Sequence, residues 1–132
     1  MPSLKLEELR VYQRAEELSD MVWNIATEWE PFAKKTLGTQ LVRAADSIGA
    51  NIAEGYGRGS FADNKRFVRI ARGSLYEVRH FLRRADKRAL VPAEAKKQLQ
   101  PLIKEISPTI NAYLKSIGRS QVSDDELETK DK

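Results

Sequence analysis

The sequence predicts an all-α protein that folds as an up-down-up-down antiparallel four-helix bundle. Four segments of about 20 residues repeat apolar side chains every three or four positions, which is the period of an amphipathic helix. Short connections containing glycine or proline separate these segments, and no segment alternates in the two-residue rhythm of a strand. We expect the bundle to occupy residues 1–117. The segment at residues 118–132 is acidic overall and shows no periodicity, so we expect it to be disordered.

Composition excludes several classes of protein. The chain has 132 residues, of which 41% are hydrophobic and 32% are charged, as expected for one globular domain. Because it has no cysteine, disulfides, thiolate catalysis and cysteine zinc sites are excluded. No apolar run approaches the roughly 20 residues that span a bilayer, and no signal-peptide core is present, so we expect a cytoplasmic protein. The net charge of +4 is a weak sign of an anionic partner.

The first predicted helix runs from about Glu8 to Glu28. Two aromatic residues, Tyr12 and Trp23, lie at the edge of its apolar face. They either cover the rim of the core or form a subunit contact, since aromatic residues are enriched at interfaces. The helix is expected to end before Pro31, because the residue preceding a proline avoids the helical region. Its predicted core face consists of Val11, Ala15, Leu18, Val22, Ile25 and Trp29.

The second predicted helix runs from about Thr36 to Gly55, after a short connection at residues 32–35. Small residues on one flank, among them Gly49 and Ala53, would let a neighbouring helix come close. Few positions are left for solvent, so we expect this helix to be enclosed by neighbours. Its predicted core face consists of Leu37, Leu41, Ala44, Ala45, Ile48 and Ile52.

A glycine-rich stretch, residues 55–59, follows the second helix. Its composition is similar to that of a phosphate-binding loop, yet it lacks the Gly-Lys-Ser/Thr of a P-loop and follows a helix rather than a strand. We therefore expect this stretch to supply a C-cap, in which a glycine takes a left-handed conformation, and to open a tight turn into the next helix.

Polar side chains run beside the apolar face of the second helix at Gln40, Arg43, Ser47, Asn51 and Glu54. An unsatisfied buried polar group costs about 1–3 kcal/mol, so such side chains need partners. One hypothesis is a structural polar network that fixes the register of the second helix against the third, formed by Arg43, Ser47, Asn51, Glu54, Ser74 and Glu77. The alternative is a catalytic or ligand-binding site. No histidine is evident as a partner for either serine, and the single histidine, His80, argues against a metal site, so we expect neither a metal nor a cofactor.

The third predicted helix runs from Phe61 to Lys87. Ser60 is suited to its N-cap, and Asp63 would complete a variant of the capping box. Its predicted buried face consists of Phe67, Ala71, Ser74, Leu75, Val78, Phe81, Leu82 and Ala85.

The opposite face of the third helix is basic. Residues 60–88 hold nine Lys or Arg against three acidic residues, a net charge of +6, so the rest of the chain carries −2. Such a face is either an ordinary solvated helix surface or a surface for nucleic-acid phosphates, which cations bind without reading sequence. Tyr76 lies among the basic residues and would stack on a base. The candidate nucleic-acid-binding residues are Lys65, Arg66, Arg69, Arg72, Tyr76, Arg79, Arg83, Arg84 and Lys87.

The fourth predicted helix begins at Pro92 and ends near Gly118. Pro101 and Pro108 interrupt its apolar stripe, and each costs on the order of 3 kcal/mol unless the helix bends. We therefore expect a kinked or broken helix that is held in place by the packing of Leu99, Leu102, Ile103, Ile106, Ile110, Leu114 and Ile117.

Two motifs resemble the four-helix bundle protein family. They are Arg-Ala-Ala-x-Ser-Ile-x-x-Asn-Ile-Ala-Glu-Gly at residues 43–55 and Phe-x-x-x-Ala-x-Gly-Ser-x-x-Glu at residues 67–77. Together with the opening at residues 9–15, the resemblance covers about residues 5–117. Members of this family were first noticed as proteins encoded in intervening sequences of bacterial large-subunit ribosomal RNA genes. The family includes the accessory variability determinant of diversity-generating retroelements.

The resemblance implies an antiparallel bundle that assembles into a barrel-like homopentamer. For the retroelement members it implies binding of nucleic acid and of a reverse transcriptase. Two hypotheses follow: a non-enzymatic, nucleic-acid-binding accessory protein, or an oligomeric scaffold for another protein such as a polymerase. An enzyme is disfavoured by the missing cysteine, the single histidine and the absence of a cofactor loop.

Overall fold

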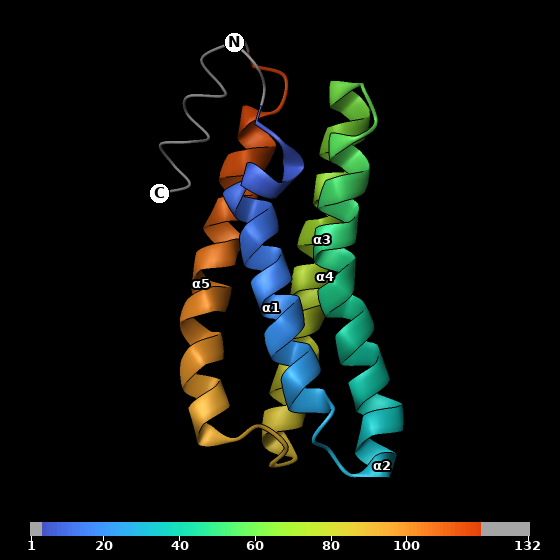
Figure 1. The fold of residues 1–132 in the computed structure, drawn as a ribbon, viewed down its shortest axis with the longest axis vertical. Coiled ribbons are helices and arrows are strands. Elements are labelled where there is room, and N and C mark those ends of the chain that lie inside the picture. Colours follow the sequence, from blue (N-terminus) through green and yellow to red (C-terminus); the bar gives the residue numbers. More distant parts are fainter. Residues whose placement is uncertain (1–3, 120–132) are drawn as a thin grey trace.

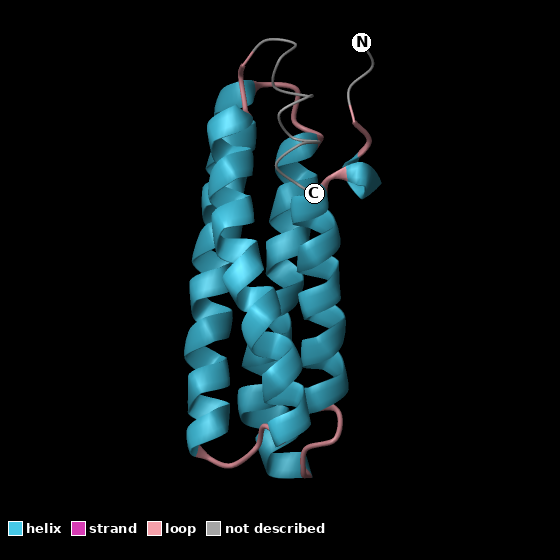
Figure 2. Cartoon of the chain, turned by 90° about the vertical axis from the view of Figure 1, so that its left-hand side faces the viewer, coloured by secondary structure: helices cyan, strands magenta, loops and turns pink. Residues whose placement is uncertain are grey.

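The computed structural model describes residues 4–119, which form a bundle of four long helices (Figure 1). The elements in chain order are a 3-10 turn at Leu6–Glu8, α1 at Arg10–Ala26, a short α2 at Pro31–Ala33, a π-helical turn at Lys34–Gly38, α3 at Thr39–Tyr56, α4 at Phe61–Lys87 and α5 at Ala93–Ser116. Successive long helices run in opposite directions, and loops are confined to short connections (Figure 2). The predicted all-α class and the four helices are confirmed. The segment predicted to be disordered lies, from residue 120 onward, outside the described residues.

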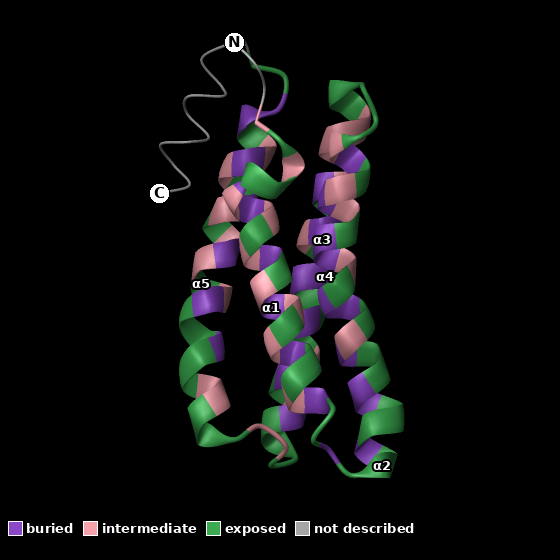
Figure 3. Ribbon diagram, viewed as in Figure 1, coloured by how far each residue is buried: buried purple, intermediate pink, exposed green. Residues whose placement is uncertain are grey.

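The four long helices enclose one apolar core. α3 packs against both α1 and α4, and α5 closes the bundle by contacting the same two helices from the other side. Buried residues occur along the length of the helices (Figure 3) and form one hydrophobic cluster. The predicted core face of the second helix is buried in full, as expected for a helix with neighbours on two sides. The largest side chains with less than 2% exposure are Leu9, Leu18, Leu41, Ile48, Ile52, Leu75, Ile106 and Ile110.

None of the helices within residues 4–119 combines the length and the apolar composition that crossing a bilayer requires. Each long helix instead has one apolar side and one charged side, which is the pattern of a helix that packs on one face and meets water on the other.

The second helical segment begins earlier than the sequence predicts. Glu30 is an N-cap whose two carboxylate oxygens accept the backbone N–H of Phe32 at 2.9 Å and of Ala33 at 2.7 Å. Pro31 takes the first helical position, where its missing N–H removes no hydrogen bond. The predicted connection at residues 32–35 is therefore wrong, because this segment is helical and continues through the π-helical turn into α3.

The glycine-rich stretch caps α3 and forms the turn into α4, as the sequence predicts. The C-cap is Gly57, whose φ of −84° is right-handed instead of the predicted left-handed conformation. α3 extends to Tyr56, so Gly55 lies inside the helix. A Cβ atom at Gly55 would lie 2.7 Å from Oδ1 of Asn64 and 3.0 Å from Cβ of Phe67. The missing side chain therefore lets α3 and α4 approach each other. Gly59 supplies the turn itself, with a left-handed φ of 84°.

α4 has the bounds that the sequence predicts. Oγ of Ser60 accepts the backbone N–H of Asp63 at 3.1 Å, which confirms the N-cap. The carboxylate of Asp63 pairs with Arg66 at 3.6 Å instead of completing a capping box. After the helix, Ala89 adopts a left-handed φ of 59°, and Leu90 N–H donates to the carbonyl of Ala85 at 2.9 Å. This bond satisfies the carbonyl of Ala85 in the last turn of the helix.

α5 is continuous although it contains two prolines. Of the two predicted alternatives, a kinked or a broken helix, the break is wrong, because helical structure runs without interruption from Ala93 to Ser116. Pro101 and Pro108 are seven residues apart and both are exposed, so they share the solvent side of the helix. Water on that side is able to bind the carbonyls that each proline leaves without an N–H partner. The core side of α5 is preserved, with Leu99, Leu102, Ile106 and Ile110 buried.

Gly55→Ala is expected to destabilise the bundle, because the new methyl group would overlap atoms of Asn64 and Phe67. Overpacking of this kind typically costs about 1–3 kcal/mol. Gly73→Ala is the matched control, since Gly73 lies inside α4 with no atom within 4 Å of the position of a Cβ. Alanine there should raise the free energy of unfolding by up to about 1 kcal/mol. Urea denaturation followed by circular dichroism measures both changes, and unchanged stability of Gly55→Ala would contradict the close approach.

Candidate nucleic-acid interface

α4 carries a line of basic residues along its solvent side. Seven of the nine predicted contact residues follow one another at steps of three or four, so they share one side of the helix. At 1.5 Å per residue this line is about 33 Å long. The other two predicted residues, Arg66 and Arg84, lie on α4 beside the line. We call the seven residues the basic stripe: Lys65, Arg69, Arg72, Tyr76, Arg79, Arg83 and Lys87.

Within residues 4–119 the six cations of the basic stripe form no ion pairs, so no carboxylate there balances their charges. Arg72 donates from Nη1 to Oδ1 of Asn111 on α5 at 3.2 Å, and a neutral amide leaves the charge of the guanidinium unbalanced. Lys65 and Arg72 are partly buried, whereas the remaining four cations are exposed. The stripe is therefore available to an anion without breaking an ion pair.

Tyr76 places an aromatic ring in the middle of the basic stripe. The side chain is 59% exposed, and the guanidinium carbon of Arg79 lies 5.3 Å from the centroid of its ring. This is a cation–π contact, which holds the arginine beside the ring. An exposed ring among cations is the combination by which proteins bind single-stranded nucleic acid.

Two lysines of α5 extend the basic surface and were not among the predicted contacts. Lys96 and Lys104 line a groove between α4 and α5 together with Arg79 and Arg83. Nζ of Lys96 lies 2.8 Å from Oδ1 of Asp86, the acidic residue of the groove, and balances its charge. No spacing within α5 shows that the two lysines lie beside the cations of α4, because this depends on how the two helices pack.

The groove between α1 and α3 has the opposite charge. It has a volume of about 370 Å³, and Glu16, Asp20 and Asp46 line it beside Tyr12. Burial raises the pKa of the Tyr12 hydroxyl, and the charges of Glu16 and Glu7 raise it further, so this ring stays neutral. The α1–α3 groove and the basic stripe of α4 therefore carry charges of opposite sign.

Three residues of the hypothesised polar network lie together between α3 and α4. Oγ of Ser47 and Oγ of Ser74 are 2.9 Å apart. Nδ2 of Asn51 donates to Oγ of Ser47 at 2.9 Å and to its carbonyl at 2.8 Å. Ser74 is only 5% exposed, so the bond to Ser47 satisfies a hydroxyl inside the interface. We call these three residues the polar cluster.

The other three residues of the hypothesised network lie outside the polar cluster. Arg43 and Glu77 are exposed, and no hydrogen bond joins them to the cluster within residues 4–119. Glu54 is also exposed and pairs with Nε of Arg58 at 3.1 Å. Their inclusion in one network is therefore wrong. Arg43 and Glu54 on α3, and Glu77 on α4, lie on the solvent side of the polar cluster, so water solvates them.

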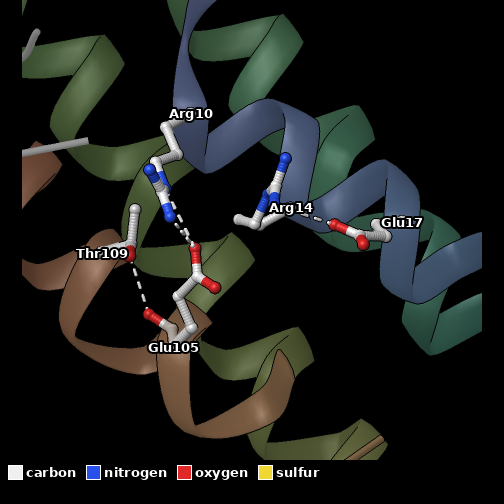
Figure 4. A network of polar contacts seen from close by, with 5 residues as sticks. All are labelled: Arg10, Arg14, Glu17, Glu105 and Thr109. Atoms are coloured by element: carbon white, nitrogen blue, oxygen red, sulfur yellow. Dashed lines mark hydrogen bonds and ion pairs between the residues drawn. The ribbon is translucent and has the colours of Figure 1, made fainter. Parts of the chain in front are cut away.

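An unpredicted polar network joins α1 to α5 (Figure 4). Nε and Nη2 of Arg10 lie 3.0 Å and 2.9 Å from Oε2 of Glu105. Thr109 donates to the carbonyl of Glu105 at 2.7 Å, and Arg14 pairs with Glu17 on α1 at 3.1 Å. The Arg10–Glu105 pair is about one-third exposed, so its contribution to stability is about 1 kcal/mol or less. Its role is to hold α5 against α1.

His80 is exposed on α4, where its ring meets the edge of the Phe81 ring at a centroid distance of 5.3 Å. Among the residues that the structure describes, no three side chains of His, Asp or Glu converge in a way that would hold a metal ion.

Ser74→Ala is expected to lower the free energy of unfolding by about 1 kcal/mol, because it removes the hydrogen bond between α3 and α4. Arg43→Ala is the control, since an exposed residue outside the polar cluster should change stability by no more than about 0.5 kcal/mol. Urea denaturation of both variants provides the comparison. An equal effect of the two substitutions would contradict a structural role for the cluster.

The sequence matches the family described as 23S rRNA-intervening sequence protein over residues 7–112. No curated protein matches the sequence. The matched range begins before α1 and ends within α5, so it includes the polar cluster and the whole basic stripe. This match confirms the family that the two sequence motifs indicated. The chain therefore belongs to the 23S rRNA-intervening sequence protein family.

Proposed function

We propose that this protein is a non-enzymatic, oligomeric accessory protein that binds nucleic acid through the basic stripe. The observation that carries the proposal is a line of six cations on one side of α4, none of them paired with a carboxylate within residues 4–119. Such a line binds phosphates by releasing counterions, so it supplies affinity without sequence specificity. The family name, which refers to an intervening sequence of 23S rRNA, agrees with a role near nucleic acid.

The hydrogen bonds of the two serines that could act as nucleophiles support a non-enzymatic role. Ser47 and Ser74 bond to each other and to Asn51, and the chain offers no histidine beside them to act as a base. The single histidine, His80, lies on the exposed side of α4.

The oligomeric part of the proposal comes from the resemblance, which implies a ring-shaped homopentamer. Trp23 supports it, because this large aromatic side chain is 56% exposed on α1 and is suited to a subunit contact. A ring would repeat the basic stripe once in each subunit. Several stripes acting on one polyanion would raise the overall affinity without any new contact.

The second candidate function is an oligomeric scaffold for a protein partner, such as a reverse transcriptase, with no direct role for nucleic acid. The observation in its favour is the same unpaired basic stripe, which would also suit an acidic protein surface. Capture of the partner by the purified protein, repeated after nuclease treatment, separates the two functions. Loss of the partner with nuclease favours a nucleic-acid bridge, and persistence favours direct contact.

Binding to labelled duplex DNA is expected to weaken steeply with salt. The slope of log K against log salt should be about −0.9 for each phosphate contacted, and no steeper than about −5 for one stripe of six cations. In the variant Arg69→Gln/Arg83→Gln the slope should become shallower by about 2, because two phosphate contacts are lost. Fluorescence anisotropy between about 50 and 200 mM salt measures these slopes.

The control for this experiment is Lys34→Gln/Lys35→Gln, which makes the same change of net charge at exposed positions outside α4. It should leave the slope almost unchanged. Equal effects of the two double variants would show that only net charge matters. Absence of binding to both duplex and single-stranded DNA at low salt would overturn the proposed function.

Sedimentation velocity is expected to find a species several times heavier than the 15.0 kDa chain, with a pentamer as the form that the resemblance implies. Trp23→Ser should shift the distribution toward the monomer, because it removes the exposed ring from the proposed contact. The control Phe32→Ser removes another exposed aromatic ring, which lies in α2. A monomer at all micromolar concentrations would contradict the ring.

A further inference from the structure

A groove of about 420 Å³ lies between the second half of α4 and the first half of α5. Its volume falls in the range of about 300–1,000 Å³ that is typical of small-molecule sites. Four apolar side chains form its floor, of which two are almost fully buried and two are partly exposed: Leu82, Leu99, Val91 and Ile103.

The rim of the groove is cationic on both sides. Arg79 and Arg83 stand on the α4 side, and Lys96 and Lys104 stand on the α5 side. Asp86 is the acidic residue that lines the groove, and Lys96 neutralises it at 2.8 Å. Among the residues that the structure describes, the other three cations around the apolar floor form no ion pair.

The aromatic ring of the basic stripe adjoins this groove. Arg79 lines the groove and at the same time lies 5.3 Å from the ring centroid of Tyr76. A ligand on the α4 side thus meets an exposed ring and then the apolar floor, with cations along the whole path. Alternation of flat apolar surface and positive charge is complementary to a chain of bases and phosphates.

We propose that the α4–α5 groove receives an unstacked base of single-stranded nucleic acid, while the cations of the basic stripe and Lys104 hold the flanking phosphates. This inference rests on the proposed function and narrows its ligand from any polyanion to a single strand. In a duplex the bases are paired and stacked, so none enters a groove without an additional cost of a few kcal/mol. In a single strand the bases are free to turn outward and stack on protein side chains.

The test compares three labelled oligonucleotides with equal numbers of phosphates: a single strand, the same strand with abasic sites in place of its bases, and a duplex. Fluorescence anisotropy at a fixed low salt concentration measures each affinity for the full chain. The intact single strand should bind about tenfold or more tightly than the abasic strand, because a stacked base contributes that much. It should also bind more tightly than the duplex.

Ile103→Asn tests the groove directly, since it replaces a partly buried floor residue with a polar one. The difference between the intact and abasic strands should then fall several-fold, whereas the salt dependence should not change because no cation is removed. Leu114→Asn is the matched control, because Leu114 is also a partly buried apolar residue of α5 but does not line the groove. Circular dichroism shows whether each variant keeps its helices.

Equal affinity for the intact and abasic strands would overturn the groove assignment and leave the proposed function standing. Tighter binding of the duplex would do the same. Failure of all three oligonucleotides to bind would overturn both. If an acidic amphipathic peptide bound with dependence on Ile103 while the strands ignored that substitution, the groove would be a protein-docking site and the inference would be wrong. The comparison of strands uses the unmodified protein, so its result does not depend on how the variants fold.

Discussion

The close packing of α3 against α4 is the constraint on which the rest of the structure depends. Gly55 lacks the side chain that would collide with Asn64, and the bond between Ser47 and Ser74 joins the same two helices further along. The small and apolar side of α4 is thereby committed to α3 and the core. Because a helix has a fixed rotation per residue, the position of this side also determines where the cations point. The basic stripe faces outward as a consequence of how the core is packed.

Both the charge of the surface and its apolar groove follow from that orientation. In the proposed function, the cations along α4 would attract any polyanion, and the acidic groove between α1 and α3 would make that attraction one-sided. Neither feature would read a nucleotide sequence, because phosphates are the same at every position. In the proposed complex, the apolar floor between α4 and α5 would add contact with the faces of bases, which would distinguish a single strand from a duplex without distinguishing one base from another. A protein built in this way would accompany many nucleic acids rather than recognise one.

Local spacing explains what the sequence was able to predict. The four helices, the buried face of α3, the Ser60 cap and the line of cations on α4 all depend on residues within a few turns of one another. The beginning of the second helical segment was missed because Glu30 and Pro31 act as a cap and a first-turn proline, while Pro31 was interpreted only as a terminator. The sequence predicts a glycine cap within residues 55–59 but not the role of Gly55, because the close approach of α3 to α4 depends on residues of the next helix.

The remaining features of the site depend on how distant helices are rotated against each other. Ser47 and Asn51 face α4, whereas Arg43, on the same polar side of α3, faces water. The rotation about the helix axis that separates these positions is too small for sequence periodicity to resolve. The pair of Arg10 and Glu105 joins residues 95 positions apart, and charge alone does not select one such pair among many. The α5 side of the groove was missed for the same reason, since Lys96 and Lys104 become neighbours of Arg83 only after the bundle is assembled.

The two prolines of α5 have a consequence for how the bundle opens. Each of them removes an amide donor from the helical ladder, so α5 has fewer internal bonds to lose than a helix of equal length without them. α3 and α4, in contrast, are joined by close packing and the bond between Ser47 and Ser74. We therefore expect transient opening to begin with detachment of α5 rather than separation of α3 from α4, with native-state hydrogen exchange fastest in α5 among the four long helices. On this expectation the α5 wall of the groove is the adaptable one, and the α4 wall is the rigid one.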